Sequence, residues 1–287
     1  MHFATINEKE RFEIDDLDWR RPIAQEMKAQ GFDKQAERFC QCHKRVILVG
    51  CNTQSHEPIR IAMPSRCENR ICPVCGKVKS FRIRRKIRAM MKGIPQVKGN
   101  RLMLLTLTKK SNGKDGFTKE SIKEFFGQVR KFMNRFYPAK SNSGGIVILE
   151  IGKDFNLHVH CVVFGPYIHQ AVLSKVWNEI TGDSKIVDIR EIKNHKSATN
   201  YITKYVTKNT ELEGPKEYVL IIKEMYKLRA MRTYGIFYNF KVLKEPFTCP
   251  LCGESFHYQG TFGMVILDQS GMTYKEMKQF FETGEVI

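Results

Sequence analysis

The segment at 157–164 constrains the fold of this chain most, because it combines the alternation of a β-strand with two histidines on one side. It reads LHVHCVVF, and a period of two residues places His158 and His160 on the same face of a sheet. Leu157, Val159 and Cys161 point to the opposite face. Two histidines in this spacing are suited to bind one metal ion.

A second apolar run, IVILEI at 146–151, precedes this strand and is separated from it by the loop GKDFN. A loop of this length is ordinary for a hairpin, so we expect the two runs to pair as antiparallel strands. In that register Glu150 lies opposite His158 and shares a face with both histidines. The inference depends on the register, because a slip of one residue would turn Glu150 to the other face.

Two imidazoles and a carboxylate form a ligand set that suits Mn²⁺ or Mg²⁺. Such a set leaves coordination positions open for substrate oxygens, whereas a structural zinc site is closed. A lone histidine on a strand is usually structural, but the three side chains together favour a metal. We therefore predict that Glu150, His158 and His160 hold a divalent metal ion.

Strands and helices alternate around this hairpin. The expected strands are 101–110, 146–151, 157–164 and 185–192, and the expected helices are 117–137, with Thr118 as N-cap, 170–182 and 197–209. The order β-α-β-β-α-β-α with an antiparallel centre predicts a single α+β sandwich. A further helix is expected at 217–231 and an aromatic strand at 233–240.

The helix at 197–209 carries Tyr201 and Tyr205 four residues apart, which places both on one helix face. Two tyrosines in this spacing are often simply packed in a core. Beside a metal site, however, a phenol can become a nucleophile, because a cation helps to deprotonate it or a metal polarises the phosphate that it attacks. Lys204 and Lys208 flank Tyr205 with positive charge, although solvated helix lysines are the alternative interpretation.

Nine cysteines in a chain without a secretory signal favour metal binding over disulfides. Eight of them are clustered and are candidate zinc ligands: Cys40, Cys42, Cys51, Cys67, Cys72, Cys75, Cys249 and Cys252. The sequences CPVCG and CPLCG within this set have the form of zinc knuckles. Cys161 stands alone in an apolar strand, where we expect a buried structural thiol.

The spacing leaves the assignment of cysteines to one or two zinc ions open. In one arrangement the two knuckles share an ion and the second ion is held by Cys40, Cys42, Cys51 and Cys67. In another, a histidine replaces a cysteine in local sites, the candidates being His43, His56 and His257. Free or oxidised thiols are the third possibility.

The charge of the chain indicates a polyanionic partner. Lysine and arginine number 48 against 30 acidic residues, and the resulting charge of +18 favours nucleic acid. Arg82, Arg84, Arg85 and Arg88 crowd onto an expected helix at 80–94 and are candidate phosphate contacts, with a solvated face as the alternative. No apolar run approaches the roughly 18 residues that cross a bilayer, and the N-terminus is polar and acidic. We therefore expect no membrane partner and a cytoplasmic location.

Three motifs of this chain, LMLLTLT, HVHCVVF and YITKYVTK, resemble in order and spacing those of the HUH endonucleases. The similarity is closest to plasmid and viral rolling-circle replication initiators that have a histidine pair and a tyrosine helix. The stretches CENRICPVCGKVKSFRIRR, VWNEITGDSKIVDIREI, LRAMRTYGIFYNF and CPLCG also resemble parts of this family. The resemblance thus extends from about residue 40 to residue 258.

The resemblance implies a nuclease with a permuted RRM-like sheet, which nicks single-stranded origin DNA presented as a hairpin and holds a divalent metal on Glu150, His158 and His160. It implies that Tyr205 attacks the scissile phosphate, leaving a 5′-phosphotyrosine link and a free 3′-OH for a host polymerase. Tyr201 stands where relatives vary, and a tyrosine there implies two transfer steps by two tyrosines. The sequence contains no GxxxxGK[ST] motif, so a host helicase is an expected partner.

We expect four segments: a helical arm at 1–39, in which Gly31 separates two helices, a zinc-binding module with the basic helix at 40–98, the endonuclease domain at 99–215, and a C-terminal segment with the second knuckle at 216–287. Residues 40–80 are expected to be rich in loops. Two other functions remain open at this point. One is an HUH-type single-strand transposase or a mobilisation relaxase, and the other is a non-catalytic zinc-dependent DNA-binding protein.

Overall fold

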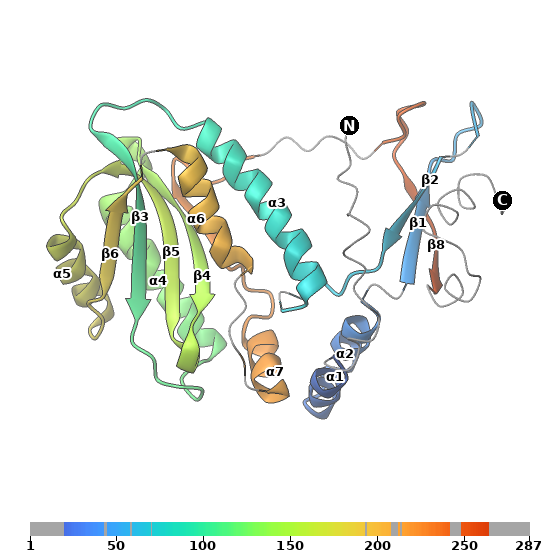
Figure 1. Ribbon diagram of the computed structural model, residues 1–287, viewed down its shortest axis with the longest axis horizontal. Helices are drawn as coiled ribbons and strands as arrows, with labels where there is room; N and C mark the ends of the chain where they lie inside the picture. Colours follow the sequence, from blue (N-terminus) through green and yellow to red (C-terminus); the bar gives the residue numbers. More distant parts are fainter. Residues whose placement is uncertain are drawn as a thin grey trace. The chain divides into compact units, whose positions relative to one another are not determined.

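The computed structural model (Figure 1) describes residues 20–42, 45–57, 59–69, 71–192, 194–207, 212, 214–241 and 248–263. Residues 1–19 of the expected helical arm, as well as His43 and Lys208, lie outside these residues. The chain divides into two compact units. The first is assembled from 1–68, 214–219 and 245–287, and the second from 69–213 and 220–244.

A five-stranded antiparallel sheet forms the centre of the second unit. Its strands are β3 (Asn100–Lys109), β4 (Gly144–Ile151), β5 (Leu157–Pro166), β6 (Val187–Glu191) and β7 (Met231–Gly235), and their order in the sheet is β6-β3-β5-β4-β7. Glu150 pairs with His158, so the predicted register of the hairpin is confirmed. The mixed α+β class is confirmed as well, since helices follow and precede these strands in the expected order.

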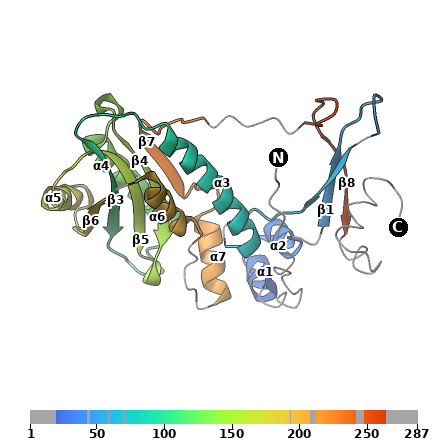
Figure 2. The same cartoon turned by 45° about the horizontal axis from the view of Figure 1, so that its top comes forward.

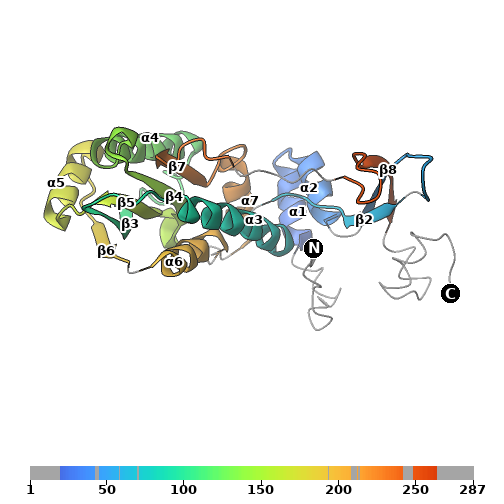
Figure 3. The ribbon, with the colours of Figure 1, turned by 90° about the horizontal axis from the view of Figure 1, so that it is seen from above.

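Helices cover both faces of this sheet. Figure 3 shows α4 (Lys119–Phe136) and α6 (His195–Thr207) on opposite sides of it. The helix α5 (Gln170–Thr181) packs beside α4 and β6, and α3 (Pro73–Lys92) packs beside α6, as Figure 2 also shows. Since both faces are covered, strand residues of either orientation can be buried, and β4 is buried along its whole length.

The start of α4 shows why this helix begins where the sequence predicts. The hydroxyl of Thr118 accepts a hydrogen bond from the Ser121 amide at 3.1 Å, and the Ser121 hydroxyl accepts one from the Thr118 amide at 3.0 Å. This reciprocal capping box satisfies two amides that would otherwise lack a partner in the helix. Thr118 is therefore the N-cap, as predicted.

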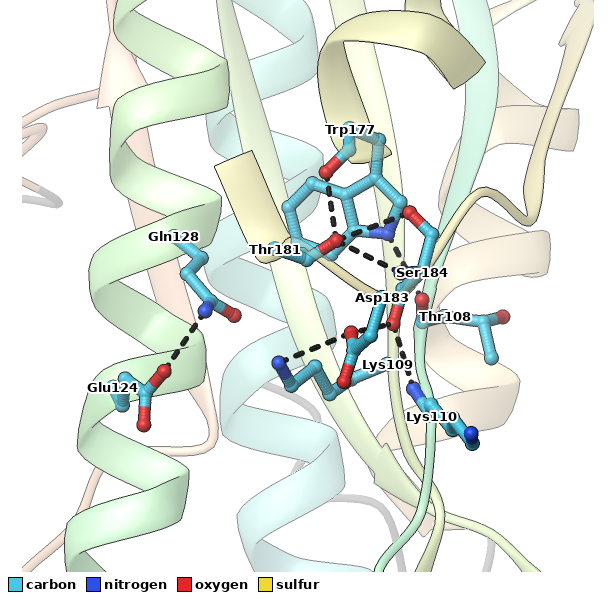
Figure 4. Close-up of polar contacts among 9 residues, drawn as sticks. All are labelled: Thr108, Lys109, Lys110, Glu124, Gln128, Trp177, Thr181, Asp183 and Ser184. Atoms are coloured by element: carbon cyan, nitrogen blue, oxygen red, sulfur yellow. Dashed lines mark hydrogen bonds and ion pairs between the residues drawn. The ribbon is translucent and has the colours of Figure 1, made fainter. Parts of the chain in front are cut away.

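Trp177 of α5 joins the helical layer to the end of β3. Its ring is fully buried against Phe125 and Phe132 of α4, with ring centroids 6.1 and 5.7 Å away in edge-to-face geometry. Its indole Nε1 donates a hydrogen bond of 2.9 Å to the carbonyl oxygen of Thr108 (Figure 4). The indole thus fixes the backbone of Thr108 from one face of the sheet, while the Thr108 side chain points to the opposite face.

The loop after α5 adds two further contacts to the same end of β3 (Figure 4). The hydroxyl of Ser184 accepts a hydrogen bond from the Lys110 amide at 2.9 Å, and the ammonium of Lys109 lies 3.3 Å from the Asp183 carboxylate. Hydrogen bonding from Ser184 and the nearby Lys109 lower the pKa of Asp183. These contacts fix the end of β3 that carries Thr108.

The first unit contains a smaller sheet that the sequence did not predict. Its order is β2 (Arg60–Pro64), β1 (Arg45–Gly50) and β8 (His257–Gly263), with both pairings antiparallel. The expectation that 40–80 is rich in loops is therefore wrong where β1 and β2 form and where α3 begins, at Pro73. The reason is that the central strand β1 obtains one partner from about 200 residues away, so local periodicity gives a weak signal.

The helices α1 (Arg20–Ala29) and α2 (Asp33–Cys40) precede this sheet in the chain. Gly31 separates them with φ of +79°, a left-handed conformation that glycine adopts without strain, as the sequence predicts. No helix in the part of the chain that the structure describes combines the length and apolar character that crossing a membrane requires.

Two boundaries between residues 215 and 240 differ from expectation. The helix α7 (Pro215–Glu224) ends seven residues before the expected end at Met231, and Lys227 beyond it has a φ of 62°. The strand β7 ends at Gly235, where φ is +60° and a Cβ would lie 2.1 Å from the Ser143 carbonyl oxygen. Only glycine fits this close approach, so the chain turns there instead of extending to Phe240.

We predict that Trp177→Phe lowers the free energy of unfolding by about 1–3 kcal/mol, because it leaves the Thr108 carbonyl without the indole donor while keeping an aromatic ring. Chemical denaturation measures the change. Val172→Ala, an exposed position on the same helix, serves as control and should change stability by less than about 0.5 kcal/mol. Equal stability of Trp177→Phe and the parent protein would show that the hydrogen bond contributes nothing.

Candidate active site

Polar side chains gather on the sheet face that α6 covers. The register pairs Thr106 with His160 and Thr108 with His158 across β3 and β5, and Glu150 with His158 across β4 and β5. Paired residues of antiparallel strands point to the same face, so these five side chains form one continuous group. We call this group the polar row.

Glu150 and His160 are in direct contact at the centre of the polar row. The Oε2 atom of Glu150 lies 2.5 Å from Nε2 of His160, and both side chains are about nine-tenths buried. A carboxylate in this environment requires a compensating donor or cation, because removal from water disfavours its charge. The contact is a short hydrogen bond, in which the two residues share one proton.

The threonines of β3 orient both imidazole rings. The hydroxyl of Thr108 lies 3.0 Å from Nδ1 of His158, and the hydroxyl of Thr106 lies 3.2 Å from Nδ1 of His160. Each ring therefore has its Nδ1 atom engaged on the β3 side. The sequence analysis missed these two residues, although the alternation in LTLTKK places them on the same face as the histidines.

His158 is also accommodated by the hairpin loop. A Cβ on Gly152 would lie 3.0 Å from Nε2 of His158, so the glycine leaves room for the ring. His158 is half-buried, whereas His160 is buried. The more accessible of the two histidines thus lies at the end of the polar row next to the loop.

Both tyrosines of α6 lie against His160. The ring of Tyr205 stacks on the imidazole with centroids 3.4 Å apart and planes 8° from parallel. The Tyr201 hydroxyl lies 3.3 Å from Nδ1 of His160 and 3.5 Å from the Thr106 hydroxyl. The two tyrosine rings are 5.2 Å apart, so the spacing of four residues brings both phenols to one place.

The environment keeps the Tyr205 phenol protonated. Burial is the largest cause that raises the pKa of Tyr205 above the ordinary value, and the hydrogen bond with Tyr201 and the negative charge of Glu150 raise it further. Arg190 acts in the opposite direction. A phenol in this state needs an additional positive charge or a base before it can act as a nucleophile at neutral pH. Of the lysines predicted beside it, Lys204 is exposed on α6.

The three predicted metal ligands share a face, but their ligand atoms do not all lie within 4.8 Å of one another. Among the residues that the structure describes, the groups whose ligand atoms all lie within 4.8 Å of one another consist of cysteines, in one case together with a histidine. The donor set of Glu150, His158 and His160 nevertheless fits Mn²⁺ or Mg²⁺, since it combines a carboxylate oxygen with imidazole nitrogens.

The predicted basic helix is α3. Arg82, Arg84, Arg85 and Arg88 are all exposed, and the helix contains no acidic residue. Its opposite side, with Ile87 and Met90, is buried in the same core as Ile202 of α6. Phe81, which the sequence analysis did not single out, is 63% exposed in the midst of these arginines.

The clustered cysteines are distributed over both units. In the first unit, Cys51, Cys249 and Cys252 gather with His56, which favours the alternative in which a histidine replaces a cysteine. Cys249 and Cys252 therefore gather with Cys51 and His56 and not with the CPVCG knuckle, so the arrangement in which the two knuckles share one ion is wrong. Cys161 is fully buried in β5, as predicted, and its burial raises the pKa of its thiol.

The remaining clustered cysteines belong to both units. In the first unit, the Cys67 amide lies 3.4 Å from the sulfur of Cys42, and Cys40 is half-buried at the end of α2. In the second unit, Cys72 is the N-cap of α3, and Cys75 lies buried in its first turn.

Comparison with known proteins places these features in a family. No curated protein and no solved structure matches the chain. A family model described as "Replication protein" matches residues 59–250, which include α3, the five-stranded sheet, the polar row and both tyrosines. The match covers more than half of the chain, and the protein therefore belongs to this family of replication proteins, of the rolling-circle type.

Proposed function

We propose that this replication protein nicks single-stranded origin DNA through Tyr205, with a divalent metal held by Glu150, His158 and His160, and later transfers or religates the strand. The observation that carries the proposal is the stacking of Tyr205 on His160, whose Nε2 contacts Glu150. A candidate nucleophile and candidate metal ligands are thereby in van der Waals contact. Membership of the rolling-circle family supports the same activity.

The groups that contact the Nδ1 atoms of the two histidines support the metal assignment. Metal-binding histidines usually engage their second ring nitrogen with a neighbouring group, which sets the orientation of the ring. Here Thr106 and Thr108 engage the two Nδ1 atoms, so each histidine would bind a cation through Nε2, which in His160 faces the Glu150 carboxylate. When bound, the metal would polarise the scissile phosphate and neutralise the charge that develops on it.

The chain itself supplies the nucleophile and its orientation. The Tyr205 oxygen forms a bond to phosphorus while the bond between phosphorus and the 3′ oxygen breaks, and the phenol proton is lost. The products are a 5′-phosphotyrosine and a free 3′-OH, so one phosphate ester replaces another and no ATP is required. Since its environment raises the Tyr205 pKa, this proton loss depends on positive charge near the phenol.

Tyr201 supplies a second phenol for a later transfer step. Its hydroxyl lies 3.3 Å from Nδ1 of His160, whose Nε2 contacts Glu150. With Nε2 of His160 as the atom that would hold the metal, Nδ1 can accept a hydrogen bond from the Tyr201 hydroxyl and so orient this phenol. We place Tyr205 first and Tyr201 second, with a host polymerase extending the 3′-OH and a host helicase separating the strands in the cytoplasm.

Tyr205→Phe should abolish the covalent adduct with single-stranded origin DNA, because it removes the attacking oxygen and keeps the ring that stacks on His160. Incubation with Mn²⁺ and the DNA, followed by denaturing electrophoresis, measures the adduct. Tyr201→Phe is the matched control and should still form it. A full adduct in Tyr205→Phe and none in Tyr201→Phe would exchange their roles. DNA binding without any adduct in the parent protein would instead favour a non-catalytic DNA-binding protein.

His160→Ala should eliminate metal-dependent cleavage and leave salt-sensitive DNA binding largely intact, since it removes a ligand without altering the basic surface. Thr108→Val keeps the shape of the side chain but removes the partner of His158, and should weaken Mn²⁺ binding by roughly 10- to 100-fold. Isothermal titration with Mn²⁺ and a cleavage assay measure both effects. Cleavage that proceeds unchanged in His160→Ala would remove the metal assignment.

The exposed side of α3 is the DNA surface that we propose. Phe81, Arg84, Arg85 and Arg88 share one helix face by their spacing, and Arg82 flanks it. Single-strand binding proteins combine basic side chains, which contact phosphates, with aromatic rings, on which bases stack. The exposed ring of Phe81 amid arginines, on a helix without acidic residues, provides both elements.

Phe81→Ala should weaken binding to single-stranded DNA by about tenfold, because one stacked base is worth about 1–3 kcal/mol. Arg84→Gln with Arg88→Gln should instead reduce the salt dependence of binding, by about 0.7 in the logarithmic slope for each lost phosphate contact. Fluorescence anisotropy at several salt concentrations separates the effects. Tyr167→Ala, at an exposed aromatic position outside α3, is the control, and equal losses at Tyr167 and Phe81 would contradict the assignment.

A further inference from the structure

The group of Cys51, His56, Cys249 and Cys252 is independent of the nuclease site and lies entirely in the first unit. Its three sulfur atoms and one imidazole nitrogen all lie within 4.8 Å of one another. We propose that these four residues bind one structural Zn²⁺ in tetrahedral geometry, with His56 as the fourth ligand.

The distance between the two closest ligand atoms fits zinc. The sulfur of Cys249 lies 3.5 Å from Nε2 of His56. In a tetrahedral site, Zn–S bonds of about 2.3 Å and Zn–N bonds of about 2.0–2.1 Å place a sulfur and a nitrogen ligand roughly 3.5 Å apart. Three thiolates and one imidazole form a closed ligand set, which is typical of a structural site.

The His56 ring is oriented for metal binding. Its Nδ1 lies 2.6 Å from the Glu57 carbonyl oxygen, which can only accept a hydrogen bond, so Nδ1 carries the proton. Nε2 then carries the lone pair, and it lies within 4.8 Å of the three sulfur atoms. This arrangement, in which the second ring nitrogen donates to a backbone carbonyl, is the usual second shell of a zinc-bound histidine.

The backbone holds the sulfur atoms in place. In the CPLCG knuckle, the Cys249 amide donates to the Glu254 carbonyl at 2.8 Å and the Gly253 amide donates to the Cys249 carbonyl at 2.8 Å. Gly253 has a φ of +75°, which allows the tight turn. The Cys51 amide donates to the Ile59 carbonyl at 3.2 Å, and the thiols of Cys51 and Cys249 are buried.

The site joins two segments that are far apart in the chain. His56 and Cys249 are separated by 193 positions, and the strands next to them, β1 and β8, pair in the three-stranded sheet. A small sheet buries little apolar surface, so a metal ion can contribute much of the free energy that holds it together. Zinc would thereby fasten the segment 248–263 to β1.

Metal analysis of the purified full chain tests the proposal. His56→Ala and Cys249→Ser should each contain one equivalent of zinc less than the parent protein, measured by mass spectrometry of the metal. His257→Ala and Cys40→Ser are the matched controls, because His257 is exposed on β8 and Cys40 lies outside the group, and both should keep the parent zinc content. An unchanged zinc content in His56→Ala and Cys249→Ser would overturn the proposal.

A second variant keeps the test valid where loss of the metal unfolds the unit. His56→Cys should retain the full metal content, and with Co²⁺ in place of zinc its thiolate charge-transfer absorption should increase, because four sulfur ligands replace three. An unchanged cobalt spectrum would show that residue 56 is not a ligand. Limited proteolysis after chelation should release the segment 248–263 in the parent protein, and continued protection would contradict its fastening by zinc. None of these measurements depends on nicking activity.

Discussion

The antiparallel pairing of β4 with β5 is the interaction on which the candidate active site depends. It places Glu150 opposite His158, so that a carboxylate and two imidazoles share one face of the sheet. A slip of one residue would move Glu150 to the face of α4 and α5. Every residue of β4 is buried, so such a slip would also exchange all of its apolar contacts, and the register is strongly specified.

The face beneath α6 divides into an apolar and a polar part, and the same helix serves both. Ala198 and Ile202 of α6 are fully buried in the core with Ile148 and Val162, whereas Tyr201 and Tyr205 reach the polar row. The packing of one helix on the sheet therefore sets the position of both phenols. The burial that stabilises the fold also raises the Tyr205 pKa, so the proposed nucleophile needs a nearby positive charge to lose its proton.

The central sheet could be predicted because its signals are local. The strand that holds the histidines alternates, the strand that holds Glu150 is a continuous apolar run, and the loop between them is short, so these local patterns sufficed. The small sheet of the first unit could not be predicted in this way. The strands β1 and β2 are short, and β8 reaches β1 from the far end of the chain, so no local pattern shows the pairing.

The sequence by itself determined which residue types stand where: two histidines and a glutamate on one face of a hairpin, two tyrosines one helical turn apart, and a basic helix without acidic residues. These are short-range patterns, which the fixed periods of strands and helices translate into geometry. Only the tertiary structure decided that Thr106 and Thr108 engage the imidazoles, that Phe81 is exposed, and that His56 and Cys51 meet the distant CPLCG knuckle. Such contacts join segments far apart in the chain, and they depend on how whole elements pack rather than on any local spacing.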